Sequence, residues 1–450
     1  MTQIKALVYT LVVFALICAA SYIAFGQTPR QLSLKEALAL TMANNHSIKI
    51  TALDVEKLQQ EIIVAKSNRL PTVGISGQVD HFFRAPAFFG FGSNGSNGDK
   101  IPYGRFGGRD QATAALFITQ PLYDAGIRPK VQYANLLQRT SSLIASDKKT
   151  NIAAAVKQTY IFILVLNERI KLQKESLLRN EKALKDARSL LAQGRALRVD
   201  TLRAYTSVKN LEPDLLKLGY AVEVGKQQLK TLAGIEPGLI IELSDSLALP
   251  SSSNTLTEDD VYNEAKLYRA DLKALDLQQQ LADQQIKLAA APMKPFVSLN
   301  AQYLLQTQVN NFNYLKAYYP STPFVGAQVT VPIFNGHRNK AKVKQAKIEK
   351  DQSVMRSTNA YEELRSEVKK VVADVQETAA RMKTSANVKE TARLSYDITQ
   401  YRYAKGVASR LELTDAELAL TTAQSNYLEA VYDYLSAQIE LERTMGKIGE

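Results

Sequence analysis

The sequence predicts a mostly α-helical protein with a small β part, built by internal tandem duplication. Three observations support this fold class. Two stretches of unusual length carry helical periodicity with almost no Gly or Pro. Four short segments instead alternate between apolar and polar residues, as strands with one apolar face do. Both kinds of segment occur twice along the 450 residues, in the same order.

The composition excludes several classes of protein. With 22% charged and 46% apolar residues, the chain is neither collagen-like nor wholly disordered. Its single Cys excludes a disulfide scaffold and a Cys-ligated zinc site. A formal net charge of +12 could indicate an acidic partner. The charges are interspersed along helical stretches, however, so we interpret them as solvated faces and predict no nucleic-acid partner.

Residues 1–26 have the pattern of a secretory signal peptide. A short, positively charged start precedes the apolar stretch 6–20, and the small residues Ala24 and Gly26 stand just before a cleavage site. A retained membrane anchor is the alternative. Cys18 invites a lipoprotein interpretation, but the residue before it is bulky where lipoprotein processing prefers a small one. We therefore expect a mature chain without cysteine.

The mature chain contains two related halves. The paired markers are Ser33-Leu-Lys-Glu36 with Thr257-Glu-Asp-Asp260, Gln120-Pro-Leu-Tyr-Asp-Ala-Gly126 with Val331-Pro-Ile-Phe-Asn-Gly336, Gly194 with Gly406, and Leu232-Ala-Gly234 with Thr444-Met-Gly446. The first pair has the form of a capping box, in which Asp260 should be a weaker partner than Glu36. We expect repeats over 27–235 and 256–447, each ordered helix, strand, strand, helix, helix. The Pro/Ser-rich segment 236–255 joins them.

Four segments predict strands with one apolar and one polar face. The apolar positions are Val73, Ile75 and Val79; Ala112, Ala114, Leu116 and Ile118; Val297, Leu299, Ala301 and Tyr303; and Val325, Ala327, Val329 and Val331. Strands of roughly 9–11 residues with this alternation suit an outer-membrane barrel. A half-buried sheet in a soluble protein would show the same pattern. Past the amino-terminal peptide, no apolar run is long enough for a helical membrane span.

Residues 127–191 and 337–403 predict helices of unusual length. The only Pro in the first, Pro129, lies at a tolerated first-turn position, so the rod should extend roughly 95 Å. The last helix shows a heptad seam at Leu413, Ala416, Leu420, Ala423, Tyr427, Ala430, Tyr434, Ala437 and Leu441. Such spacing predicts left-handed supercoiled helices. In the first half the equivalent helix contains Pro213, which should kink or break it.

No motif requires catalysis or a cofactor. Gly90-x-Gly92-x-x-Gly95 spells the dinucleotide fingerprint, but it lies in a Gly/Asn-rich loop over 82–110, which we expect to be long and flexible. The three His residues are far apart and lack the HExxH spacing, and no nucleophile elbow or P-loop occurs. We predict a protein that is not an enzyme, with no metal site and no cofactor.

Four strands cannot close a barrel, and an open sheet edge in lipid leaves backbone groups without partners. If these strands lie in a membrane, the chain must oligomerise to close the sheet. Three copies would supply twelve strands and twelve packed helices. The signal peptide, the paired strands, the long helices and the duplication together indicate a duct through the outer membrane, continued by a helical tunnel.

This order of elements resembles the TolC-type outer membrane efflux proteins, or outer membrane factors, over about residues 30–447. The markers are the Leu70-Pro71 junction, the proline-aromatic-glycine strand exits, and Tyr403-Ala-Lys-Gly406 followed by Ser409-Arg-Leu-Glu-Leu-Thr-Asp415. The resemblance implies a homotrimer: a trimeric α-helical barrel joined to a 12-stranded transmembrane β-barrel, four strands per protomer. It further implies a passive exit duct in the Gram-negative outer membrane, serving a periplasmic adaptor (membrane fusion) protein and an inner-membrane transporter for efflux or type I secretion.

The resemblance also carries roles to the tunnel mouth. Tyr403 matches a gate tyrosine, and Glu412 and Asp415 match two inward acids that would form a negative ring favouring cations. Ala408 stands where the family has a gate arginine, with Arg410 two residues later as a candidate. Alternatively, the acids merely favour a helix amino terminus. Both hairpin turns are candidate adaptor-docking sites, with Gly194, Arg195, Asp200, Gly406 and Ser409 as their residues.

Two other functions stay open on the sequence. One is a periplasmic structural coiled-coil protein without transport activity, in which the strands form a soluble cap. The other is a secreted binding protein that uses the loops at 82–110 and 306–322. Within the duct interpretation, conduits for drugs, metal ions and proteins would share the same sequence pattern.

Overall fold

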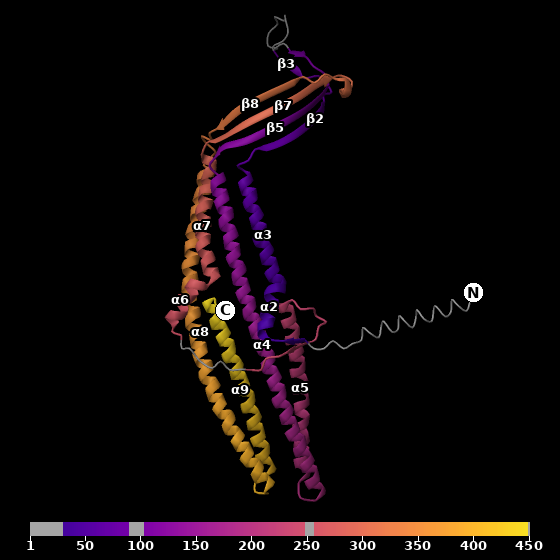
Figure 1. Ribbon diagram of the computed structural model, residues 1–450, viewed down its shortest axis with the longest axis vertical. Coiled ribbons are helices and arrows are strands. Elements are labelled where there is room, and N and C mark those ends of the chain that lie inside the picture. The colour runs from indigo at the N-terminus through magenta and orange to yellow at the C-terminus, as the bar shows by residue number, and fades with distance from the viewer. Residues whose placement is uncertain (1–29, 90–102, 248–255, 449–450) are drawn as a thin grey trace, which may run out of the picture. The chain divides into compact units, whose positions relative to one another are not determined.

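The computed structural model describes residues 30–89, 103–247 and 256–448 (Figure 1). The predicted signal peptide with Cys18, the fingerprint from Gly90 to Gly95 and the end of the Pro/Ser-rich segment lie outside the described residues. The chain divides into two compact units. The first comprises Met1–Ala52, Leu143–Leu272 and Asn359–Glu450, and the second comprises Leu53–Ser142 and Lys273–Thr358.

Long helices dominate the chain, and both halves run through the same order of elements. The first half contains α2 (Leu34–Asn44), α3 (His46–Ser67), β2 (Thr72–His81), β5 (Asp110–Asp124), α4 (Ile127–Ala192) and α5 (Arg198–Ala233); the second contains α6 (Glu258–Tyr268), α7 (Ala270–Ala290), β7 (Phe296–Val309), β8 (Ser321–Thr330), α8 (Arg338–Ala404) and α9 (Arg410–Met445). The two predicted long helices are thus confirmed as α4 and α8. Short pieces complete the list: β1 (Arg30–Leu32), β3 (Ala87–Phe89), β4 (Tyr103–Arg105), β6 (Ile241–Leu243), and the 3-10 turns η1 (Ala291–Met293) and η2 (Tyr314–Lys316).

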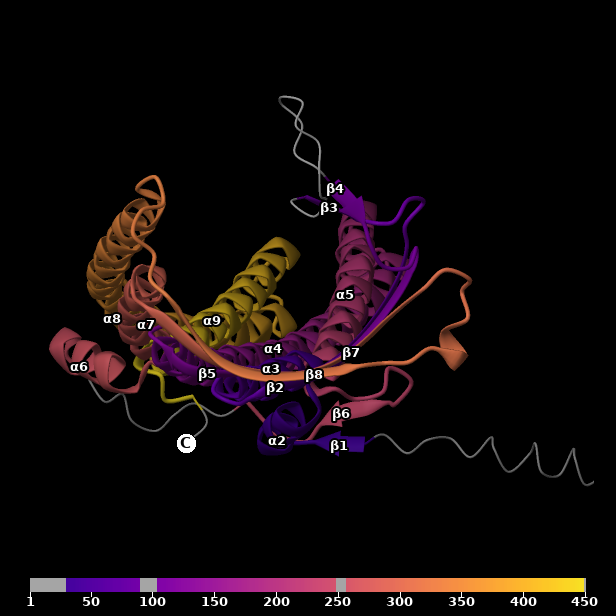
Figure 2. The same ribbon diagram turned by 90° about the horizontal axis from the view of Figure 1, so that it is seen from above.

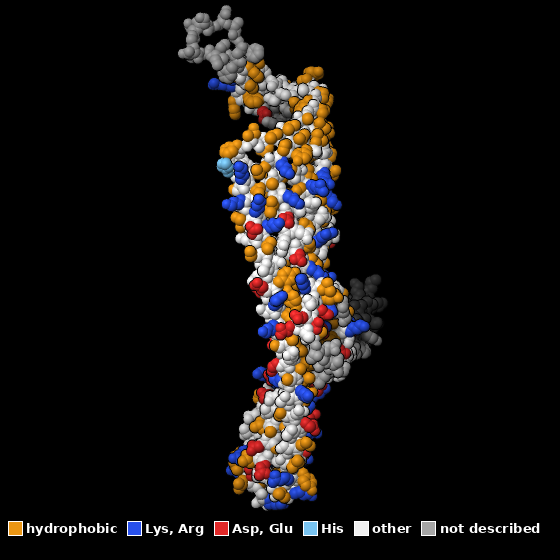
Figure 3. All heavy atoms as spheres, turned by 90° about the vertical axis from the view of Figure 1, so that its left-hand side faces the viewer, with side chains coloured by type: hydrophobic (Ala, Val, Ile, Leu, Met, Phe, Trp, Pro, Cys, Tyr) orange, Lys and Arg blue, Asp and Glu red, His pale blue; other side chains and the backbone are white. Residues whose placement is uncertain are grey.

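The second unit contains a curved antiparallel sheet with strand order β2-β5-β7-β8 (Figure 2). The register sets Val73 beside Ile118, Ile118 beside Ala301 and Ala301 beside Val325, so the predicted apolar positions share one face. That face is open: Ile75 is 82% exposed and Val325 is 73% exposed. Apolar side chains also cover the strands on the face seen in Figure 3. Among the described residues, β2 and β8 each lack a second strand partner.

The loop at 82–110 is more ordered than the sequence indicated. Its described residues contain β3 and β4, which pair antiparallel with Phe88 opposite Gly104. These two short strands were not predicted from the sequence. The Gly-rich composition of the loop indicated no strands, although β3 and β4 contain aromatic residues that favour them. Within the described ranges, no helix combines the length and apolar character that crossing a membrane requires.

The single helix expected at the start of each repeat is divided in two, and in the first half the division lies at Asn45, between α2 and α3. The Asn45 side chain accepts a hydrogen bond from the amide of Ile48 at 3.1 Å and donates one to the carbonyl of Leu232 at 2.8 Å. An Asn side chain competes in this way for backbone groups and ends one helix while capping the next. The second half is interrupted at Arg269, between α6 and α7, where Arg269 hydrogen-bonds Asp271 and Glu367.

The expected ranking of the two capping boxes was wrong. At the start of α6, Thr257 and Asp260 bond each other's backbone amides reciprocally, which completes the box. At the start of α2, Ser33 accepts from the amide of Glu36, but the Glu36 carboxylate instead binds Arg30 at 2.5 Å. The Glu36 carboxylate therefore pairs with a nearby guanidinium instead of accepting from the Ser33 amide, and the first capping box stays incomplete.

Of the two outcomes predicted for Pro213, a kink or a break, the break does not occur: helix α5 continues through this residue. Pro213 is exposed, so the carbonyl that its missing amide would have engaged can be hydrated instead. The predicted heptad seam lies on the packed side of the last helix, α9, where Leu420, Ala423, Ala430, Tyr434 and Leu441 are buried and the other seam positions are half-buried.

The core of the first unit is centred on Tyr160 of α4. Its ring packs with Ile163, Leu229 and Leu32, and its hydroxyl donates to the carbonyl of Leu32 at 2.8 Å. The hydroxyl also lies 2.9 Å from Asp245 Oδ2. Burial, reinforced by this carboxylate, raises the pKa of Tyr160 well above its usual value. The phenol therefore stays neutral and acts as a hydrogen-bond donor in the core.

Candidate functional site

Two helical hairpins of the first unit end in glycine turns (Figure 1). Gly194 follows α4 with a φ of 69°, and Gly406 follows α8 with a φ of 76°. Each turn ends its helix with backbone bonds from the next two amides, such as Arg195 N to Leu190 O and Val407 N to Arg402 O. This left-handed termination favours Gly because a Cβ would be strained there. A Cβ on either glycine would meet no neighbouring atom within 4 Å, so both turns are open.

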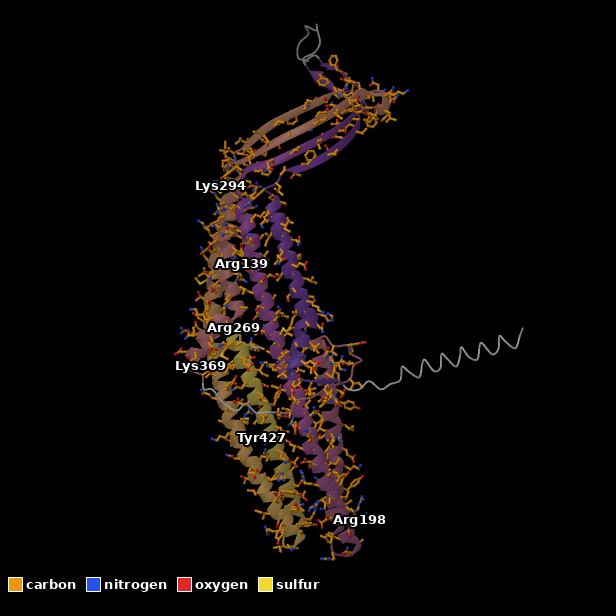
Figure 4. The ribbon with its side chains drawn as sticks, in the orientation of Figure 1. Arg139, Arg198, Arg269, Lys294, Lys369 and Tyr427 are labelled. Carbon is orange, nitrogen blue, oxygen red and sulfur yellow. The ribbon has the colours of Figure 1, made fainter. Side chains whose placement is uncertain are left out.

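Two predicted tip residues begin the helices that follow the turns. Ser409 Oγ accepts from the amide of Glu412 at 3.2 Å and thereby caps α9. Asp200 Oδ2 accepts from the amide of Leu197 at 3.3 Å at the start of α5, the helix end that Arg198 marks in Figure 4. Both residues therefore stabilise a helix start, whatever else they contact. Arg195 is exposed and available to a partner.

The turns also expose apolar side chains that the sequence analysis did not single out. Leu197 is 69% exposed and Val407 is 68% exposed, and Leu411 of α9 is exposed as well. The sequence signal for such a surface is an apolar residue within five positions after a turn glycine. Exposed Leu and Val side chains beside these open turns are suited to packing against another helical hairpin.

The structure brings Tyr403 and Arg410 together but leaves the two acids apart from them. The Arg410 guanidinium carbon lies 5.9 Å from the centroid of the half-buried Tyr403 ring. Glu412 and Asp415 are exposed on the first two turns of α9, and neither pairs with another described residue. Ala408 is half-buried in the turn. Within the chain, Arg410 thus contacts the tyrosine ring, whereas both carboxylates face solvent.

A buried ion pair lies next to these residues and was missed from the sequence. Arg179 Nε of α4 donates to both carboxylate oxygens of Glu417 of α9 at 2.9 Å. Ser176 Oγ adds a bond to Glu417 Oε1 at 3.0 Å, and Glu417 is only 9% exposed. The signal in the sequence is an acid directly after Ala416, one of the heptad seam positions. The pair joins the α4–α5 hairpin to the α8–α9 hairpin.

Tyr396 of α8 completes this cluster. The Arg179 guanidinium lies 5.8 Å from the Tyr396 ring centroid, and burial, with the nearby Glu417 carboxylate, raises the pKa of Tyr396. A cavity of about 190 Å³ adjoins the cluster and is lined by both Tyr403 and Arg410. Tyr403, Arg410 and the buried pair therefore line one cavity between the two helical hairpins of the chain.

Comparison with known proteins gives a family match over most of the chain. The family described as outer membrane efflux protein matches residues 37–235 and 261–447. The toluene efflux pump outer membrane protein TtgC of Pseudomonas putida is 21% identical over 416 residues, which cover 92% of this chain and 83% of TtgC. The proteases secretion protein PrtF of Dickeya chrysanthemi is 21% identical over 429 residues, which cover 94% of this chain and 90% of PrtF.

A solved structure shares the fold. The outer membrane protein VceC of Vibrio cholerae superposes with a TM-score of 0.73 at 18% identity, covering 92% of this chain and 96% of VceC. The family match spans both halves of the chain, including every long helix and every strand of the sheet. The chain is therefore a member of the outer membrane efflux protein family.

Proposed function

We propose that three copies of this chain form a passive exit duct, with a 12-stranded barrel in the outer membrane and a helical tunnel in the periplasm. The observation that carries the proposal is the four-stranded sheet with one exposed apolar face and two edge strands, β2 and β8. In lipid, unpaired edge amides and carbonyls cost several kcal/mol each, so edges must pair. Antiparallel order places β8 of one copy antiparallel to β2 of the next, which suits closure into a ring.

The helices supply the rest of the duct. Helices α4 and α8 contain 66 and 67 residues, and roughly 1.5 Å per residue makes each about 100 Å long. Packed side by side in three copies, such helices would form a tunnel wall. We further propose that 27–235 and 256–447 are structural repeats joined by 236–255. Each repeat would supply two strands and one coiled-coil hairpin.

The relatives point to the partners. TtgC is named as the outer membrane protein of a toluene efflux pump and PrtF as a proteases secretion protein. A passive duct supplies no driving force of its own, so transport through it requires an energised pump and a protein that connects the pump to the duct. We propose that an inner-membrane transporter and a periplasmic adaptor serve this chain in the same way. The turns at Gly194 and Gly406, with exposed Leu197 and Val407, would receive the adaptor.

Planar-bilayer recording tests the duct directly. The purified, signal-cleaved protein should insert into bilayers and give discrete conductance steps, while migrating on gels as a heat-sensitive oligomer. A product that stays monomeric in water without detergent and never conducts would favour the structural coiled-coil alternative and reject the duct.

The acids of the tunnel mouth give a first prediction. Glu412→Gln with Asp415→Asn should weaken block of the single-channel current by a multivalent cation on the order of tenfold, because six negative charges leave the mouth of a trimer. Glu181→Gln with Asp214→Asn removes two exposed acids elsewhere on the hairpins and should leave block unchanged. If the acids serve only the helix amino terminus, block will match the parent and the acidic-ring assignment fails.

The contact between Tyr403 and Arg410 gives a second prediction. Tyr403→Ala removes the ring beneath the guanidinium and should raise the ratio of open to closed time by about threefold, as expected for a partly exposed cation–π contact. Tyr403→Phe keeps the ring and should stay near the parent value. Equal opening in Phe and Ala variants would instead assign the latch to the hydroxyl and contradict the ring contact.

A further inference from the structure

The net positive charge of the chain is concentrated where strands meet helices. Four segments adjoin the strands of the sheet at their helical ends: 62–71, 125–139, 287–295 and 336–348. Together they contain twelve Lys and Arg residues and no Asp or Glu. The remaining 44 Lys and Arg residues balance the 44 Asp and Glu residues of the chain. The interspersed charge expected from the sequence therefore does not hold at these junctions.

Sheet topology brings the four segments to one place. Strands β2 and β7 start, and β5 and β8 end, at the end of the sheet that adjoins the helices. The pairing of Phe296 with both Asp124 and Thr330 shows this for β5, β7 and β8. All twelve basic side chains are exposed, and within the described ranges none of them forms an ion pair. Twelve unpaired cations at one end of a sheet repel one another unless anions screen them.

Apolar side chains border these cations on the sheet side. Leu70, Leu122, Ile333 and Phe334 are all exposed next to the strand ends, and Ile333 is 96% exposed. On the face shown in Figure 3, blue Lys and Arg side chains gather on the helices directly beside the apolar strand region. Lys294 marks the junction in Figure 4.

Two shallow grooves combine both kinds of side chain. One, of about 320 Å³, is lined by Arg69 and Arg128, by the apolar Leu122 and Tyr123, and by Asp124, whose carboxylate accepts from the amide of Gly126 at 2.7 Å. The other, of about 300 Å³, is lined by Lys340 together with Met293, Ile333 and Phe334. A ligand that fits both grooves carries an anionic group next to an apolar chain.

We infer that these junctions form a basic collar that binds the headgroups of anionic phospholipids in the periplasmic leaflet. The inference rests on the proposed function, because the collar meets headgroups only if the sheet lies in the bilayer. Apolar strand ends would then lie at the acyl boundary, and the cations, within about three helical turns of the strand ends, would extend from the phosphate plane into the adjoining aqueous layer. An acidic polymer such as peptidoglycan would explain the cations but not the apolar half of each groove.

Spin-labelled lipids test the collar in reconstituted protein. In phosphatidylcholine bilayers at low salt, the protein should immobilise spin-labelled phosphatidylglycerol about threefold more strongly than spin-labelled phosphatidylcholine. The collar variant combines Arg69→Gln, Arg128→Gln, Lys294→Gln and Lys340→Gln. It should bring the ratio to about one, and about 0.5 M salt should do the same to the parent.

A matched control removes the same charges elsewhere. It combines Lys185→Gln, Arg188→Gln, Arg203→Gln and Lys217→Gln, all exposed residues of α4 and α5, and should keep the parent ratio. Equal loss in both variants would mean that net charge alone attracts the lipid and would overturn the collar. Equal immobilisation of both lipids by the parent would overturn the collar while leaving the duct intact. If neither lipid is immobilised, the sheet is not in the bilayer, and both proposals fail.

Discussion

Arg179→Ala should lower the free energy of unfolding by about 3 kcal/mol, because it leaves the Glu417 carboxylate buried without its guanidinium partner. The carboxylate would keep only the hydrogen bond from Ser176 Oγ. Thr421 would not replace the guanidinium, because its hydroxyl lies 3.3 Å from Ser176 Oγ and bonds that hydroxyl. The Arg179 side chain is 24% exposed, which places the loss at the lower end of the range for buried pairs. Denaturant unfolding of the purified protein, followed by circular dichroism, measures the loss.

The double variant Arg179→Met with Glu417→Met separates charge from packing. Because both charges disappear together and the apolar stems remain, it should recover most of the loss and unfold near the parent. As a control, Arg393→Ala removes an exposed α8 arginine that pairs with Asp397 and should cost less than about 1 kcal/mol. A double variant as unstable as Arg179→Ala would show that the ion pair itself, rather than an unpaired buried charge, governs stability here.

Gly234→Ala should cost about 3 kcal/mol, the other large effect that the structure predicts. Gly234 ends α5 with a φ of 63°, and a Cβ there would lie 2.7 Å from the carbonyl oxygen of Asn44. An L residue in this conformation costs roughly 1–2 kcal/mol, and displacement of the Asn44 backbone adds to it. That displacement would also disturb Asn45, which caps α3 and bonds the carbonyl of Leu232.

Two other glycines provide the control for Gly234→Ala. Gly194 and Gly406 have φ values of 69° and 76°, but a Cβ on either meets nothing within 4 Å. Gly194→Ala and Gly406→Ala should therefore cost only the backbone term, about 1 kcal/mol each. Equal losses at all three positions, measured by denaturant unfolding, would contradict the close approach between α5 and the α2–α3 junction.

The features that the sequence predicted correctly depend on local pattern. The alternation around Val73 and Val325 determines strand faces, and an uninterrupted run after Pro129 determines α4, because each pattern acts within a few residues. The breaks at Asn45 and Arg269 escaped prediction because their partners, Leu232 and Glu367, lie far along the chain. The same holds for the capping box at Ser33, where Arg30 took the Glu36 carboxylate.

The candidate site was predictable in part for the same reason. Turn glycines and helix caps have local signals, so the positions of Gly406 and Ser409 follow from the sequence. Glu417 stands beside a heptad Ala, and nothing near it identifies Arg179 on another helix as its partner. The contact of Arg410 with the Tyr403 ring likewise depends on the geometry of the turn. The roles of these residues at a tunnel mouth stay predictions until the channel is recorded.

Cysteine cross-linking between strand edges tests the closed ring most directly. The single cysteine of the chain, Cys18, lies in the predicted signal peptide. In a chain cleaved there, Ser76→Cys on β2 can be combined in turn with Thr322→Cys, Gly326→Cys, Gln328→Cys or Thr330→Cys on β8. Oxidation in intact outer membranes should yield covalent trimers for at least one pair, and Ser76→Cys alone should yield none. Monomers for every pair, from protein that is present in the membrane, would contradict a sheet that three copies close together.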